Sequence, residues 1–260
     1  MSAIPNDLTG LLTGAATKQD LIGVLAADPD TSRLVLELGL FLVGAKPMVY
    51  IMSHVDSPKR NLVWEIIRAH NWGLVDQFPA PEYEKLWAAA GFALDLDPTA
   101  VVQNIVCEII GTEQGPIDDL KESLNRSLTA SLAPSSDFDF SEFAAAEEQI
   151  GLLLGYPAAS AHWFGYHYEV EGGGDISSWS DDELLFGQEV HPKDSTDLEA
   201  ARRWAQSQAD AFIEAYGREM LANFPVDRPD PEKPDEGLSE GFGQPEDYIP
   251  SSACPRCHPV

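Results

Sequence analysis

Most of the chain consists of segments in which apolar residues recur three and four positions apart, separated by proline, glycine and aspartate. This spacing places the apolar side chains on one face of a helix. Ser57-Pro58 starts a predicted helix that runs to about His70, and Pro116 starts a polar one that runs to about Leu132. The sequence therefore predicts a mainly α fold.

Apolar residues also recur at helical spacing between Asp97-Pro98 and Gly111. We expect a buried helix there, ended by the glycine. Cys107 lies among the apolar residues of this segment, where a free cysteine usually behaves as a small hydrophobe. We therefore expect Cys107 to pack in the core.

Strand patterns are short in comparison with the helical ones. The run Met48–Met52 is apolar and β-leaning, and residues 166–170 alternate weakly before a glycine turn. Farther along, Thr196 or Asp197 is expected to cap a long helix. The predicted fold class is thus mainly α, with α+β and a small minor sheet as the alternative.

Residues 1–224 are expected to form a single globular helical domain, because the 260-residue chain is 44% hydrophobic and supplies ample material for a core. Residues 225–260 contain mostly proline, glycine and acidic residues. Burial there is too small to offset the entropy of ordering. This segment is predicted to be an extended or disordered acidic tail.

The chain is strongly acidic, with 43 acidic residues, 16 basic ones and a net charge of -27. Such a charge repels the phosphates of nucleic acids and anionic lipids, so neither is an expected partner. The scarcity of lysine resembles the composition of salt-adapted organisms. At molar salt the Debye length falls to about 3 Å, and the carboxylates then serve mainly to hydrate the surface.

The expected location is the cytoplasm. The first ten residues lack the positive and apolar regions of a secretory signal, and no apolar run approaches the roughly 18 residues of a membrane span.

The sharpest motif is CPRCH at residues 254–258. Structural zinc needs four ligands, of which Cys254, Cys257 and His258 supply up to three, so zinc or iron binding requires a further ligand from elsewhere. A dithiol at this spacing also suits disulfide exchange or delivery of a metal to a partner. The pattern matches c-type haem attachment, but the expected cytoplasmic location argues against haem. The remaining alternative is that the two cysteines are exposed to solvent and have no functional role.

A second cluster, at residues 162–168, is rich in aromatic residues and contains His162 and His167. Such a cluster suits the lining of a ligand pocket. The alternative is that the rings only close the core, since histidines five positions apart do not share one helix face.

Two blocks of the sequence are similar to an uncharacterised prokaryotic family that pairs an early AGxKP segment with a later EIGxFLGYP block. They are LVGAKP at residues 42–47 and EQIGLLLGYP at residues 148–157. Gln149 stands where the family has an acidic residue, and residues 162–164 read His-Trp-Phe where the family has Gly-Phe. The resemblance implies no activity, because the family has no known function.

The first block contains Lys46, and a family motif built around this residue would suit an anionic ligand. The alternative is a lysine that snorkels from a helix end. In the second block, Gly151 and Gly155 are expected to form a smooth helix face that another element approaches closely.

The leading hypothesis is a non-enzymatic or accessory protein whose helical domain binds a partner or small ligand and whose tail presents CxxCH to a metal or a disulfide. The rival is a redox or haem-linked enzyme with a pocket around Lys46, Tyr156, His162 and His167. A third is an assembly component whose acidic second half contacts a basic partner. Common nucleotide-binding and hydrolase motifs are absent, so the sequence leaves open whether the protein is an enzyme.

Overall fold

The structure is a computed structural model that describes residues 8–27, 32–54, 58–78, 105–131, 138–167, 173–187, 191–224 and 226. Helices dominate these ranges, and one three-stranded antiparallel sheet accompanies them. This confirms the predicted mainly α fold with a minor sheet. The chain divides into two compact units, residues 1–118 with 210–224 and residues 119–209 with 225–260.

The described residues of the first unit include the helices α1 (Leu8–Thr13), α2 (Lys18–Ala26), α3 (Ser32–Leu42) and α4 (Pro58–Ala69). A capping box starts α2: the Thr17 side chain accepts from the Asp20 N–H, and the Asp20 carboxylate accepts from the Thr17 N–H. This exchange satisfies backbone donors that the first helical turn leaves open. The helix predicted to start at Pro58 is confirmed as α4.

The sheet of the first unit has the order β1-β3-β2, with β1 at Met48–His54, β2 at Leu74–Gln77 and β3 at Ile105–Gly111. The strand predicted at Met48–Met52 is confirmed. The helix predicted to end at Gly111 is wrong over the described residues, because residues 105–111 form the central strand. A central strand is buried on both faces and is often apolar throughout, so its sequence also satisfies helical spacing.

A buried polar contact joins the sheet to α4. The Trp64 indole Nε1 donates to Glu108 Oε2 over 2.5 Å, and both residues are buried. The preceding residue, Cys107, is 2% exposed, and burial together with the Glu108 charge raises the pKa of its thiol. The core role predicted for Cys107 is therefore confirmed, although on a strand.

The second unit contains most of α7 (Gln114–Ser131) and α12 (Ser195–Tyr216), and all of α8 (Phe140–Leu153), α9 (Ala158–Tyr166) and α11 (Asp181–Gly187). The helices predicted from Pro116 and near Asp197 are confirmed as α7 and α12. The predicted caps of α12 are wrong, because Asp194 Oδ1 accepts from the Thr196 N–H at 2.8 Å. An aspartate just before the helix satisfies its first free amides.

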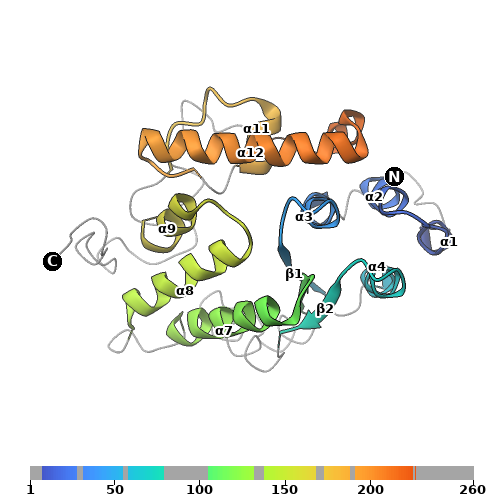
Figure 1. Cartoon of the computed structure of the whole chain (residues 1–260), viewed down its shortest axis with the longest axis horizontal. Helices are drawn as coiled ribbons and strands as arrows, with labels where there is room; N and C mark the ends of the chain where they lie inside the picture. Colours follow the sequence, from blue (N-terminus) through green and yellow to red (C-terminus); the bar gives the residue numbers. More distant parts are fainter. Residues whose placement is uncertain are drawn as a thin grey trace, which may run out of the picture. The chain divides into compact units, whose positions relative to one another are not determined.

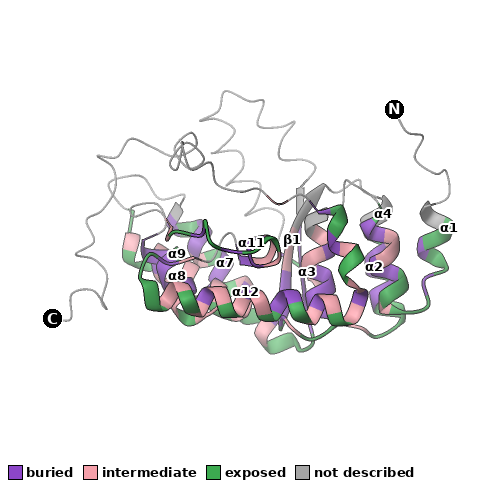
Figure 2. Cartoon of the chain, turned by 90° about the horizontal axis from the view of Figure 1, so that it is seen from above, coloured by how far each residue is buried: buried purple, intermediate pink, exposed green. Residues whose placement is uncertain are grey.

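Buried residues recur on α12 from Ala201 onward and form a buried stripe on the helix, and Figure 2 shows purple segments of this helix between pink and green ones. Small alanines occupy this stripe in the second unit, and Phe212 and Tyr216 continue it in the first. The Tyr216 hydroxyl donates to the Gly39 carbonyl over 3.1 Å. A Cβ atom on Gly39 would lie 2.6 Å from the Phe212 ring, so only glycine permits this packing.

Figure 1 shows α8 and α9 as neighbouring helices joined by a short connection. A Cβ on Gly151 would lie 2.8 Å from the Ala161 Cβ, and one on Gly165 would lie 2.5 Å from the Ala144 carbonyl oxygen. The close approach predicted at Gly151 is thus confirmed. Gly155 has a different role from the predicted one: it follows the end of α8 with φ +85°, a left-handed conformation that favours glycine.

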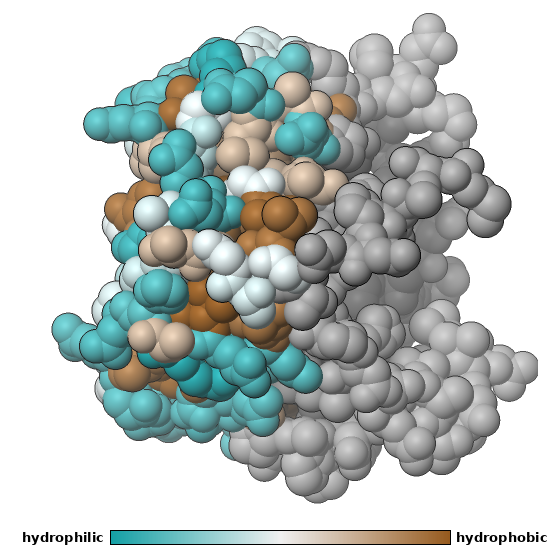
Figure 3. All heavy atoms as spheres, turned by 90° about the vertical axis from the view of Figure 1, so that its right-hand side faces the viewer, coloured by the Kyte–Doolittle hydropathy of each residue, from teal (hydrophilic) through white to brown (hydrophobic). Residues whose placement is uncertain are grey.

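The described surface mixes hydrophilic and apolar residues. On the face drawn in Figure 3, apolar residues form separate groups between hydrophilic ones. Exposed large apolar side chains belong to both units: Leu11, Val43, Leu74, Phe138, Leu152 and Phe164. Within the described ranges, no helix is long and apolar enough to cross a membrane.

The contact between α8 and α9 can be tested with Gly165→Ala. The added methyl group would overlap the Ala144 carbonyl, so we expect a loss of about 1–3 kcal/mol in the free energy of unfolding. Gly115→Ala is the matched control, because a Cβ on this exposed residue of α7 meets nothing within 4 Å. That variant should gain up to about 1 kcal/mol. Denaturant unfolding measures both, and equal stabilities would contradict the packing.

Candidate functional site

Lys46 follows α3 and lies in the core of the first unit, with a side chain that is 2% exposed. Its Nζ is 2.5 Å from Glu37 Oε2 on α3. The alternative that this lysine snorkels to solvent is wrong, because its charged group is buried beside a carboxylate. A buried charge needs such a partner. Removing Glu37 would leave the Lys46 charge buried without its carboxylate, which would destabilise the fold.

The two histidines of the aromatic cluster lie together in the second unit. His162 is on α9 and His167 is its C-terminal cap, and their ring centroids are 5.9 Å apart. Their proximity does not come from a shared helix face, which their five-residue spacing disfavours. The rings meet because His167 has φ -133° and ψ -18° and leaves the helical path.

The surroundings of His162 combine an aromatic ring with a carboxylate. Its imidazole stacks on Tyr166 at 4.7 Å between centroids, and its Nδ1 lies 3.3 Å from Glu148 Oε1 on α8. His162 and His167 are 8% and 7% exposed. The imidazole and the carboxylate therefore form a polar contact between α9 and α8.

Tyr156 lies in the connection between α8 and α9, where its ring packs against Trp204 at 5.2 Å between centroids. The Trp204 Nε1 donates to the Gly155 carbonyl over 3.1 Å. These contacts fix the α8–α9 connection to α12. Tyr156 and the two histidines thus belong to the second unit, whereas Lys46 belongs to the first.

A third histidine, His191, joins the aromatic residues of the second unit. Its ring centroid lies 5.7 Å from that of Trp163 and 6.4 Å from that of Trp179. Gly173 packs so closely on the His191 ring that a Cβ there would lie 1.8 Å from Cε1. Sequence reasoning missed His191 because nothing in its spacing relates it to His162.

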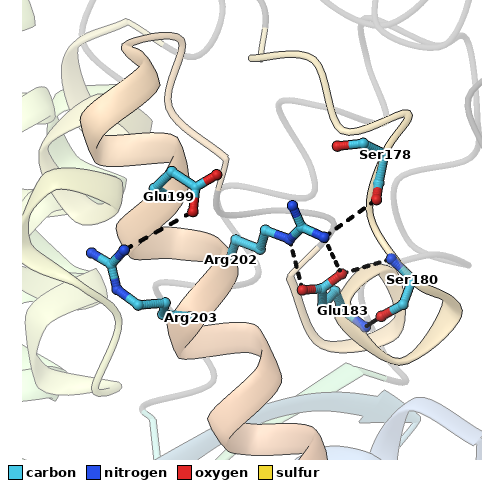
Figure 4. Close-up of polar contacts among 6 residues, drawn as sticks. All are labelled: Ser178, Ser180, Glu183, Glu199, Arg202 and Arg203. Atoms are coloured by element: carbon cyan, nitrogen blue, oxygen red, sulfur yellow. Dashed lines mark hydrogen bonds and ion pairs between the residues drawn. The ribbon is translucent and has the colours of Figure 1, made fainter.

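Figure 4 shows a polar cluster that fastens α11 to α12. The Arg202 guanidinium donates to both oxygens of Glu183, over 2.7 Å from Nε and 3.3 Å from Nη2. Glu183 also accepts from the Ser180 N–H, and the Ser180 hydroxyl accepts from the Glu183 N–H. Glu183, the third residue of the acidic run at residues 181–183, is thus a buried structural carboxylate.

Burial alone would raise the pKa of Glu183, but the hydrogen bonds from Arg202 and Ser180 outweigh it and lower the pKa below its ordinary value. Ionised Glu183 therefore stabilises the fold.

The predicted metal ligands Cys254, Cys257 and His258 lie outside the described residues. Among the residues that the structure does describe, no three histidine, cysteine, aspartate or glutamate side chains are grouped so that they could hold a metal ion.

Comparison of the chain with protein-family models, curated proteins and solved structures finds no match. The resemblance of residues 42–47 and 148–157 to an uncharacterised family stays a prediction.

Because ionised Glu183 stabilises the fold, Glu183→Gln should lower the free energy of unfolding by an amount that depends on pH. A lowered folded pKa adds stability that is complete above the unfolded value of about 4.3 and is lost as the pH falls through the folded value. We expect the variant to lose about 1–2 kcal/mol at pH 7 and to approach the original chain in strong acid.

Glu199→Gln is the control for this experiment, because Glu199 forms an exposed pair with Arg203 at 4.0 Å on α12, the helix that also carries Arg202. Its effect should stay within about 0.5 kcal/mol. Urea unfolding at several pH values measures both variants. A Glu183→Gln deficit that persists unchanged in acid would disprove the assigned role of the ionised carboxylate.

Proposed function

We propose that this protein is an accessory protein that binds a zinc or iron ion through Cys254, Cys257 and His258 and passes it to, or shares it with, a partner. The observation that carries the proposal is the CxxCH spacing at residues 254–258. Two thiolates and an imidazole are good ligands for either metal. Three ligands leave one position for a group from the partner.

Cys107, the third cysteine, is poorly suited to bind a metal, which supports the choice of Cys254 and Cys257 as ligands. Cys107 is 2% exposed in β3, and the pKa of its thiol is raised. The thiolate is the form that binds metals and attacks disulfides, and burial disfavours it. Cys254 and Cys257 are therefore the thiols to which the proposal assigns the chemistry.

The helical body would then act as a scaffold. Several ionisable side chains that the sequence singles out take part in contacts within one unit, as Lys46 does with Glu37 and Glu183 with Arg202. Such contacts fix packing and do not require a ligand.

The proposal predicts about one zinc or iron ion per purified chain, measured by mass spectrometry of the metals. The double variant Cys254→Ser/Cys257→Ser should lose the metal, whereas Cys107→Ala should keep it. A thiol reagent should modify two cysteines of the metal-free folded chain rapidly and the third only in denaturant. Metal-free original protein with the same thiol reactivity as the double variant would overturn the proposal.

A disulfide that forms reversibly between Cys254 and Cys257 without any metal would favour thiol exchange instead. The second candidate function is a redox or haem-linked enzyme, which the proximity of His162 and His167 favours. A haem or flavin absorption band that disappears in His162→Ala would support this candidate over metal delivery. Salt-sensitive co-purification with a basic protein would favour the assembly role.

A further inference from the structure

We draw no further inference here: the strongest candidate, the exposed face of α4 that carries Glu65 and Arg68 beside the His70–Trp72 stack, is a charged surface patch, and nothing in the described residues shows what covers it.

Discussion

The second unit depends on the close approach of α8 to α9 at two glycines. Gly151 and Gly165 bring the helix backbones into contact, because a methyl group at either position would overlap the opposite helix. This approach places His162 of α9 beside Glu148 of α8. The contact between this imidazole and this carboxylate is thus a consequence of the backbone packing.

In both units, buried charged side chains lie beside a partner that stabilises the charge. Lys46 is buried beside Glu37 in the first, and Glu183 is buried beneath Arg202 in the second. The buried carboxylate of Glu108 accepts a hydrogen bond from the Trp64 indole. In a chain with 16 basic residues against 43 acidic ones, such partners are scarce. Most acidic side chains must then remain in solvent, because a buried carboxylate needs a partner.

Sequence patterns predicted the elements whose signals were local. Pro58 and the polar run after Pro116 gave correct helix starts to within two residues, since capping and helical spacing are read over a single turn. The same reasoning failed for residues 105–111, where it predicted a helix and the structure has a strand. Their β-branched side chains fit a strand better than a helix, but apolar spacing alone does not separate the two. The pairing partners that decide the matter, β1 and β2, lie far away in sequence.

The sequence by itself determined the fold class, the acidity, the burial of Cys107 and the presence of a CxxCH segment, because these follow from composition and near-neighbour spacing. Only the tertiary structure decided which side chains meet. His167 reaches His162 because the chain leaves the helical path at its cap, and Glu183 reaches Arg202 across a gap of nineteen residues in sequence. Contacts of this kind depend on how the helices pack. Helix packing depends on how side chains from distant parts of the sequence fit together, and a pattern read over a few neighbouring residues does not contain that information.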